Sequence, residues 1–208
     1  MAQIFSVHPI NPQPRVIKQV AEIIASGGLV AVPTDSGYAL VARLDDRDAA
    51  ESLRKSRGLD QRHHLTLICR DLSEISHFAK VDNAQYRMLK HATPGPWTFI
   101  LPASREVPKR ISHPSRKTIG IRVPPHPVTQ ALLAEVGQAL VSTTLIAPGE
   151  TAPMADAEAI QERFGQSIAA IVDNGGCVWE PTTVIDLSST EPIVIRQGRG
   201  LLADIGLG

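Results

Sequence analysis

Residues 27–38 have the sequence Gly-Gly-Leu-Val-Ala-Val-Pro-Thr-Asp-Ser-Gly-Tyr, which links a helix end to a buried strand and a polar turn. The two glycines end a helical pattern that begins near Asn11, a suitable N-cap, and Pro12, which suits a first helical turn. The apolar run 29–32 is typical of a strand buried on both faces, and the proline that follows ends it. Polar side chains directly after a buried strand indicate an α/β sheet that binds ligands at its strand ends.

Apolar and amphipathic stretches alternate along the rest of the chain. The expected helices cover residues 46–57, 83–91, 127–136 and 156–164, and the expected strands cover 65–69, 97–101, 118–123, 139–143, 168–172, 183–187 and 193–195. Several strands are too close in sequence for helical crossovers, so we expect a twisted, mixed parallel and antiparallel sheet with flanking helices. With 208 residues, 43% of them hydrophobic, the chain is expected to form one domain over residues 1–208 with its core at about 14–200.

The composition argues against several classes of protein. No Cys/His spacing suits zinc, so no metal site is expected. The chain lacks a signal-peptide pattern and an apolar stretch of about 18 residues, so we expect no membrane segment and a cytoplasmic location. Cys69 and Cys177 lie in apolar, strand-like runs and are expected to be buried thiols. His63 and His64 are expected to be a solvated pair in a loop.

Charge is unevenly distributed along the chain, although the formal net charge is +0. Residues 54–122 contain 14 Lys or Arg and 5 Asp or Glu, whereas residues 123–195 contain 1 basic and 9 acidic residues. The overall balance argues against a dedicated nucleic-acid-binding protein, but the segregation indicates an anion-binding face. The alternative is that the two segments interleave in the fold and their charges mix on the surface.

Two polar segments permit both a functional and a structural interpretation. Thr34 could donate to the carboxylate of a small ligand, or it could lie in a turn whose Asp35 and Ser36 bond to their own backbone. Lys55 and Arg57 are expected in the last turn of a helix, where the helix dipole favours cations. They could instead extend past the helix end to a triphosphate, because an ammonium and a guanidinium bind phosphate in complementary ways.

Polar side chains also recur at alternate positions of the expected strands. Thr118 and Arg122 are four residues apart, so they share one face of a strand whose other face is apolar. An Arg buried on such a strand needs an anionic partner, which makes Arg122 a candidate ligand-binding residue. Ser142 and Thr144 share a strand face by the same argument. Arg196 follows an apolar strand and is expected to emerge at the end of the sheet.

Taken together, these segments resemble the YrdC/Sua5 family, the threonylcarbamoyl-AMP synthases of tRNA modification, and most closely its YciO-type branch. The family's Pro-Thr-acid-hydroxyl-Tyr, Lys-x-Arg, Pro-Gly-Pro-x-Thr and Thr-x-x-x-Arg elements match residues 33–40, 55–57, 94–98 and 118–122. Their order and spacing form a specific signal, and the similarity extends from about Ile17 to Gly198. The resemblance implies a YrdC-like α/β domain with a large concave cleft lined by positive charge.

The resemblance also implies an activity. L-threonine and bicarbonate would form a carbamate that attacks the α-phosphate of ATP, so that pyrophosphate leaves and threonylcarbamoyl-AMP forms. ATP would be a substrate that carries Mg²⁺ on its phosphates, and catalysis would depend on positioning and charge neutralisation. By the resemblance, the catalytic pair is Lys55 and Arg57, the ATP-binding residues are Lys55, Arg57, Thr118, Thr144 and Arg196, and the threonine-binding residues are Thr34, Arg122, Ser142 and Thr183.

Two positions depart from the family pattern. Gly58 follows the Lys-x-Arg element, where the synthases usually have proline. The family's Ser-x-Asn element aligns with residues 144–146, so Ile146 replaces an amide that could bind phosphate or metal. The chain ends at Gly208 and is expected to lack the additional C-terminal domain of the Sua5-type members.

Two functions therefore stay open. The first is an ATP-dependent threonylcarbamoyl-AMP synthase linked to tRNA-modification proteins, which the retained Lys55, Arg57 and Arg122 favour. The second is a protein whose basic cleft binds tRNA or double-stranded RNA with reduced or lost synthase activity, which Ile146 favours. A synthase requires saturable dependence on ATP and threonine, whereas RNA binding predicts an affinity that falls steeply with salt.

Overall fold

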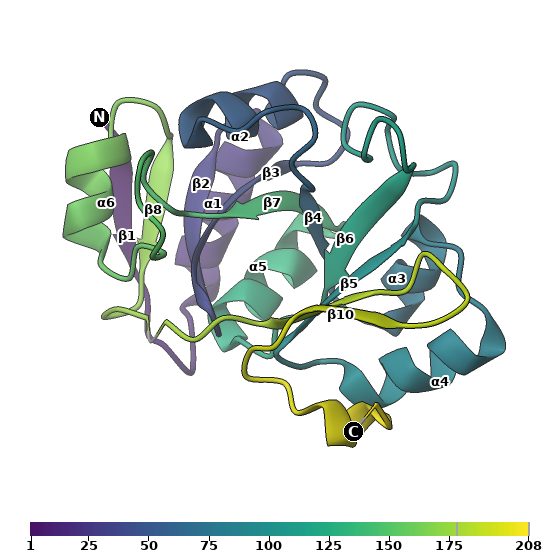
Figure 1. The fold of residues 1–208 in the computed structure, drawn as a ribbon. Helices are drawn as coiled ribbons and strands as arrows, with labels where there is room; N and C mark the ends of the chain where they lie inside the picture. Colours follow the sequence, from purple (N-terminus) through teal and green to yellow (C-terminus); the bar gives the residue numbers. More distant parts are fainter. Residues whose placement is uncertain (178, 208) are drawn as a thin grey trace.

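The computed structural model describes residues 1–177 and 179–207, and its centre is one sheet of ten strands (Figure 1). The strand order is β1-β8-β2-β3-β7-β4-β6-β5-β9-β10. The strands are β1 (Gln3–Ser6), β2 (Val30–Thr34), β3 (Gly37–Arg43), β4 (Thr66–Ile68), β5 (Trp97–Pro102), β6 (Thr118–Arg122), β7 (Leu140–Thr144), β8 (Ala170–Asp173), β9 (Thr183–Asp186) and β10 (Ile193–Arg196). Parallel pairs such as β1–β8 and antiparallel pairs such as β3–β7 both occur, so the predicted mixed sheet is confirmed.

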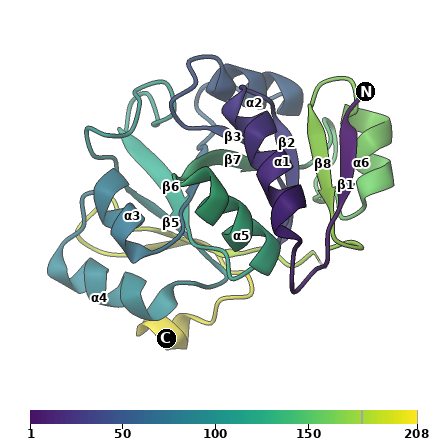
Figure 2. The same ribbon diagram turned by 180° about the vertical axis from the view of Figure 1, so that it is seen from behind.

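Helices surround the sheet. They are α1 (Pro14–Ala25), α2 (Ala49–Arg57), α3 (Leu72–Phe78), α4 (Asn83–Ala92), α5 (Pro127–Val136) and α6 (Ala157–Phe164), followed by the 3-10 helix η1 (Leu202–Ile205). Figure 2 shows α1 and α5 side by side against one face of the sheet. Val20 and Ile24 of α1 pack there with Leu132 of α5 and with Val30 of β2. The other helices contribute to a second hydrophobic cluster.

The first helix begins later than the sequence predicts. Pro14 occupies its first turn and Gln13 precedes it, so the prediction that Asn11 and Pro12 begin the helix is wrong. The chain turns around His8 instead, whose Nδ1 accepts hydrogen bonds from the backbone N–H groups of Ile10 (3.2 Å) and Asn11 (3.0 Å). A competing side-chain acceptor therefore moves the helix start to the next proline.

The polar turn after β2 is tight, as the sequence predicts. The strand continues through Pro33 to Thr34, and β3 starts at Gly37, so only two residues separate the antiparallel strands. Gly37 has a φ of 96°, a conformation that favours glycine. Strand β3 was not predicted from the sequence, and Tyr38 anchors it by donating its hydroxyl to the carbonyl of Val172 at 3.1 Å. This hairpin places the polar turn in the middle of the sheet.

Strand β6 has the alternation that its sequence predicts. Ile119 and Ile121 are buried in the second hydrophobic cluster, whereas Gly120 and Arg122 face a cleft on the other side of the sheet. A side chain at Gly120 would place its Cβ 2.8 Å from the Oγ1 of Thr66, so β4 and β6 approach closely there. Glycine at this position keeps the cleft side of the sheet open.

The two cysteines differ in their surroundings. Cys69 is buried, as predicted. Cys177 is only half-buried and follows β8 in a loop rather than lying in a strand, so the prediction of a buried strand thiol is wrong for this residue.

Candidate functional site

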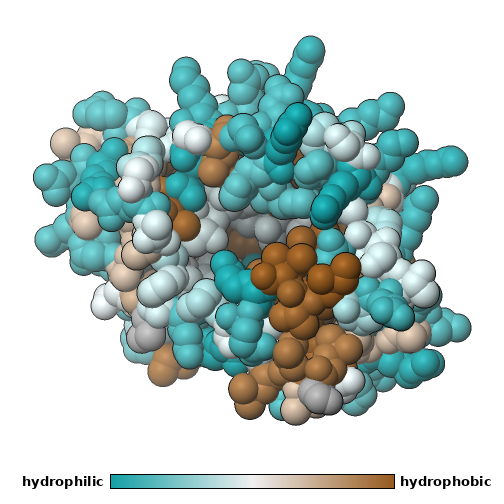
Figure 3. All heavy atoms as spheres, in the orientation of Figure 1, coloured by the Kyte–Doolittle hydropathy of each residue, from teal (hydrophilic) through white to brown (hydrophobic). Residues whose placement is uncertain are grey.

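A cleft of about 290 Å³ opens where the ends of several strands meet the C-terminal end of α2. Figure 3 shows this hollow near the centre of one face, with an apolar surface on one side and hydrophilic residues on the other. Its lining includes the guanidinium groups of Arg57, Arg122 and Arg196 and hydroxyl groups from several strands. None of the described lining residues is a carboxylate. The cleft is therefore suited to an anionic ligand.

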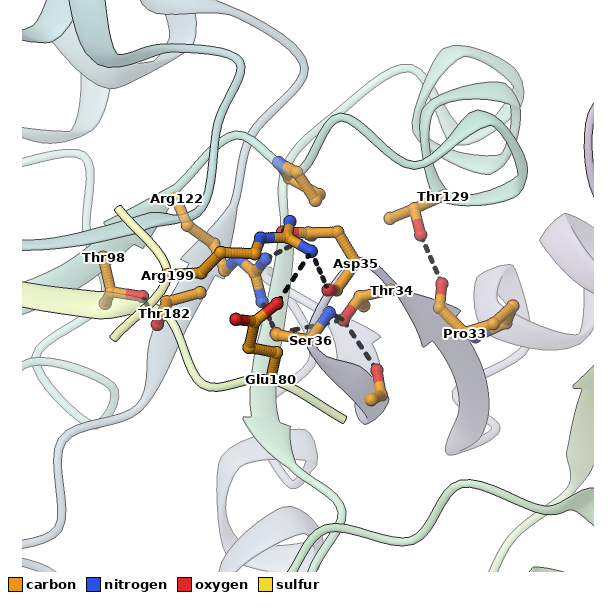
Figure 4. Close-up of polar contacts among 12 residues, drawn as sticks. Pro33, Thr34, Asp35, Ser36, Thr98, Arg122, Thr129, Glu180, Thr182 and Arg199 are labelled. Atoms are coloured by element: carbon orange, nitrogen blue, oxygen red, sulfur yellow. Dashed lines mark hydrogen bonds and ion pairs between the residues drawn. The ribbon is translucent and has the colours of Figure 1, made fainter. Parts of the chain in front are cut away.

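Arg122 lines this cleft, and the turn between β2 and β3 holds its guanidinium (Figure 4). Its Nη2 donates to Oδ1 of Asp35 at 2.5 Å, and its Nη1 donates to Oγ of Ser36 at 2.8 Å. Only 8% of Arg122 is exposed, and burial lowers the pKa of its guanidinium, which nevertheless stays charged. Among the described residues, no partner meets its buried Nε. A ligand anion would have to compete with Asp35 for the Nη donors, because the Nε is buried.

Asp35 also binds a second arginine, which comes from the segment after β10. Nη2 of Arg199 donates to Oδ2 of Asp35 at 2.9 Å, and Nη1 donates to the carbonyl oxygen of Asp35 at 3.1 Å (Figure 4). Glu180 lies 4.0 Å from the same guanidinium. The alternative in which Asp35 bonds to its own backbone is therefore wrong, because its carboxylate bridges two guanidinium groups. This bridge ties the C-terminal segment to the β2–β3 turn.

Thr34 builds the turn and does not line the cleft. Its Oγ1 donates to the carbonyl of Gly37 at 2.6 Å and accepts from the backbone N–H of Ser36 at 3.2 Å. The Oγ1 of Thr129 on α5 donates to the carbonyl of Pro33 at 2.6 Å, which holds the turn from the other side. With 3% exposure, Thr34 has a structural role, in a turn that its own hydroxyl holds rather than the Asp35 carboxylate. Its predicted role in threonine binding rests on the resemblance alone.

Helix α2 brings Arg57 to the cleft but not Lys55. The Nε of Arg57 donates to the carbonyl of Thr144 at 2.6 Å, and its Nη1 donates to the carbonyl of Ile146. Lys55 is exposed and lines hollows on the outer side of α2. Side chains two residues apart on a helix leave it about 200° apart, and here Arg57 faces the cleft while Lys55 faces the outer side. The expectation that both reach past the helix end is therefore not met.

The predicted strand residues divide between the cleft and its supporting wall. Ser142 and Thr144 both line the cleft, as does Thr143 between them. The Oγ of Ser142 donates to the carbonyl of Thr66 at 2.9 Å, whereas Thr144 is exposed. Thr118 is buried behind the lining, where its Oγ1 lies 3.1 Å from Nε2 of His64. Thr118 therefore contributes to the site by positioning a lining residue.

Strand β9 places a different threonine at the cleft from the one predicted. Thr183 is fully buried, and its Oγ1 donates to the carbonyl of Gly200 at 2.7 Å. Thr182 lines the cleft instead, with its Oγ1 2.9 Å from Oγ1 of Thr98. The Nε of Arg196 donates to the carbonyl of Thr182 at 3.1 Å, and this arginine also lines the cleft. Thr182 replaces Thr183 as the candidate on this strand.

His63 and His64 lie in a loop, as predicted, and His63 is exposed, whereas His64 is half-buried and is not the solvated residue that the sequence predicts. Both line the cleft, and the ring of His64 lies 4.7 Å from the ring of His113. No spacing in the sequence indicates this, because the loop after α2 brings them there only in the folded chain. Thr98 and Thr182 were recognisable, since both belong to polar segments at strand ends.

We expect the free energy of unfolding to fall as the pH decreases from 7 to 5, in part because of His64. Burial, followed by the charges of His113 and Arg116, lowers the pKa of His64 below its usual 6.5. Burial lowers the pKa of His63 and His126 in the same direction. The unfolded chain therefore binds more protons than the folded chain, so stability present above about pH 6.5 is lost as the pH falls. Urea denaturation across this range should show the slope, and His64→Gln should reduce it; an identical slope would contradict the prediction.

A model of the Sua5/YciO/YrdC domain, described as telomere recombination, matches residues 22–198. The chain belongs to the Sua5/YciO/YrdC family. Its relatives include the YciO protein of Escherichia coli (strain K12), which is 46% identical over 200 residues, 96% of this chain and 97% of that protein. The crystal structure of E. coli YciO has a TM-score of 0.94 at 44% identity and covers 99% of this chain and all of that one. The family therefore accounts for the fold.

Threonylcarbamoyl-AMP synthases are also relatives within the family. The synthase of Halorhodospira halophila is 31% identical over 180 residues, which is 86% of this chain and 93% of that protein. The crystal structure of Pyrococcus abyssi Sua5 complexed with L-threonine has a TM-score of 0.86 at 27% identity. It is matched over 94% of this chain and 57% of its own length. The family thus includes synthases and one member solved with this amino acid.

Ile146 occupies the position at which the family pattern has an asparagine, and it lies beside Arg57. Its side chain lines the cleft, and its carbonyl accepts from Arg57. Within residues 1–177 and 179–207, no three His, Cys, Asp or Glu side chains are arranged to hold a metal ion. In that same part of the chain, no helix combines the length and apolar character needed to cross a bilayer.

Proposed function

We propose that this family member condenses L-threonine, bicarbonate and ATP into threonylcarbamoyl-AMP, with release of pyrophosphate. The observation that carries the proposal is the convergence of Arg57, Arg122 and Arg196 on one cleft without a carboxylate among its described lining residues. The reactants are a carboxylate, a carbonate and a triphosphate, and all of them require cationic partners. The relatedness to synthases and to the Sua5 structure with bound L-threonine supports the same activity.

The amino acid would lie near Arg122, whose guanidinium would bind the threonine carboxylate. The hydroxyl groups of Ser36, Ser142 and Thr182 line the same cleft and could bond to the ammonium or hydroxyl group of the substrate. A ligand carboxylate would compete with Asp35 for Arg122, because both anions need the same donors. The affinity for threonine would therefore depend on how readily Asp35 gives up its bond to Arg122 and keeps only its bond to Arg199.

The nucleotide would occupy the end of the cleft near Arg57, Thr144 and Arg196. The threonine nitrogen forms a carbamate with bicarbonate as water is lost, and a carbamate oxygen then forms a bond to the α-phosphorus. The bond from that phosphorus to the bridging oxygen breaks, and pyrophosphate leaves with the electron pair. Arg57 and Arg196 would stabilise the charge that develops on the phosphates. Mg²⁺ would enter with the nucleotide and neutralise part of the phosphate charge.

The assignment of Lys55 and Thr118 to ATP binding rests on the resemblance alone, and the proposed mechanism uses neither residue. Lys55 points away from the cleft, and Thr118 acts through His64. Delivery of the product to tRNA-modification proteins is likewise part of the proposal. The second candidate, a cleft that binds tRNA or double-stranded RNA without synthesis, is favoured by one observation, which is the apolar Ile146 side chain at the cleft.

Release of pyrophosphate from ATP by the purified protein tests the proposal, with bicarbonate and magnesium present and L-threonine added or withheld. Threonine-dependent release, together with threonylcarbamoyl-AMP detected by mass spectrometry, is the expected result. Absence of release would contradict the synthase activity. An RNA affinity whose logarithm falls linearly with the logarithm of salt concentration would then favour the second candidate.

A further inference from the structure

A second basic hollow lies on the outer side of α2 and shares no described lining residue with the cleft. This outer pocket has a volume of about 740 Å³ and lies between α2 and the loop that joins β5 to β6, which Figure 1 shows next to each other. Five cationic side chains and two carboxylates contribute to its lining, namely Arg47, Arg54, Lys55, Lys109 and Arg110, with Glu51 and Asp60. The outer pocket therefore has an excess of three positive charges.

Arg54 is the buried cation among the described residues that line the outer pocket, and the nearby carboxylate of Asp60 compensates its charge only in part. Only 9% of Arg54 is exposed, and burial lowers the pKa of its guanidinium. Its Nη1 donates to the carbonyl of Arg110 at 3.1 Å, while its Nε is buried and has no partner among the described residues. An arginine cannot lose its charge at any ordinary pH, so this burial is unfavourable unless an anion compensates it.

The neighbouring cations are also free of carboxylate partners. Among the described residues, neither Arg47, Arg54, Lys109 nor Arg110 forms an ion pair. The Nη2 of Arg110 donates instead to two backbone carbonyls of the loop between β3 and α2, that of Asp45 at 3.1 Å and that of Asp46 at 3.0 Å. These contacts orient the guanidinium before any ligand arrives, and such preorganisation favours binding.

We propose that the outer pocket is a binding site for a phosphate-bearing anion, separate from the cleft. Guanidinium groups bind phosphate oxygens in pairs, and the flexible lysine and arginine side chains at the rim can close over the ligand. The phosphate could belong to a free phosphorylated compound or to a nucleic-acid backbone, since both present the same oxygens. The site depends on neither ATP nor threonine, so it stands whether or not the proposed synthesis occurs.

Inorganic pyrophosphate is the probe, because it needs no assumption about the natural ligand. Titration calorimetry should find one binding site fewer in the double variant Arg47→Ala/Lys109→Ala than in the wild-type protein. Arg87→Ala/Lys90→Ala on α4 is the matched control, since it removes the same charge from exposed positions that do not line the outer pocket. An equal number of sites in the wild-type protein and the Arg47/Lys109 variant would overturn the proposal, as would an equal loss in the control.

Arg54→Met provides an independent test. The wild-type melting temperature should rise by about 5 to 10 °C at a pyrophosphate concentration of about 100 times Kd. The unliganded variant should melt close to the wild-type temperature, because the buried charge that has been removed forms no ion pair among the described residues, and its rise with pyrophosphate should be smaller. An undiminished rise would overturn the site. Competition with a short RNA duplex distinguishes the sources: displacement of pyrophosphate from the outer pocket indicates a nucleic-acid backbone, and no displacement indicates a free phosphorylated compound.

Discussion

Replacement of Arg57 by alanine should reduce threonine-dependent pyrophosphate release by about 100- to 1,000-fold. Two losses combine in this variant. The cleft loses the guanidinium next to the proposed phosphate position, and the chain after β7 loses the donors that bond to the carbonyls of Thr144 and Ile146. Steady-state kinetics should therefore show a decrease in kcat as well as an increase in the KM for ATP.

Lys55→Ala is the matched control, because it removes a cation from the same helical turn. Since Lys55 faces the outer side of α2, the variant should retain activity within about threefold of the wild-type protein. A loss as large as that of Arg57→Ala would show that the end of α2 rearranges when ATP binds. Normal turnover in Arg57→Ala would contradict the assignment of Arg57. Arg57→Lys should restore only part of the rate, because a lysine cannot bond to both carbonyls with fixed geometry.

Replacement of Arg122 by methionine should lower the free energy of unfolding by about 3 kcal/mol. The Asp35 carboxylate, only 8% of whose side chain is exposed, would then keep a single ion pair, the one with Arg199. The free-energy cost of a buried carboxylate without its main partner exceeds the stabilisation that the intact ion pair provided. The double variant Asp35→Asn/Arg122→Met should therefore recover most of the lost stability. Urea denaturation of the four proteins in this cycle measures the coupling between the two residues.

Binding of L-threonine separates the two roles of this pair. Arg122→Met should abolish detectable binding, because the ligand carboxylate loses its guanidinium. Asp35→Asn should bind L-threonine about tenfold more tightly, equivalent to about 1.4 kcal/mol, since the substrate no longer competes with an internal carboxylate. Weaker binding by Asp35→Asn would contradict this competition and would indicate that Asp35 mainly orients Arg122.

The sequence predicts elements whose pattern is set locally. The helix at 127–136 has a proline at its start and a glycine after its end, and it occurs with those bounds. Strand β6 alternates as predicted, because its pattern depends only on the period of a strand. Strand β3 was missed because its apolar run from Tyr38 to Ala42 shows no alternation and directly follows a turn of only two residues.

The site was harder to predict, because the direction of a polar side chain depends on distant neighbours. Thr182 directly precedes β9 and Thr183 is its first residue, and the hydrogen bonds of Thr183 with Gly200 and Gly198 hold its side chain away from the cleft. Lys55 and Arg57 look equivalent in the sequence, but the helical rotation between them separates them. His64 reaches the cleft through a loop whose path no local pattern specifies.

The bridge from Arg122 through Asp35 to Arg199 makes occupancy of the cleft and closure of the C-terminal segment thermodynamically linked. A ligand carboxylate that binds Arg122 would displace Asp35 from it. Asp35 would then interact with Arg199 alone, so the ion pair that holds the segment after β10 would strengthen as the ligand binds. Linkage is reciprocal, so whatever holds that segment in place must also tighten the ligand by the same factor. Amide hydrogen exchange after β10 should then slow on ligand addition, which would make the end of the chain a reporter of events at the centre of the sheet.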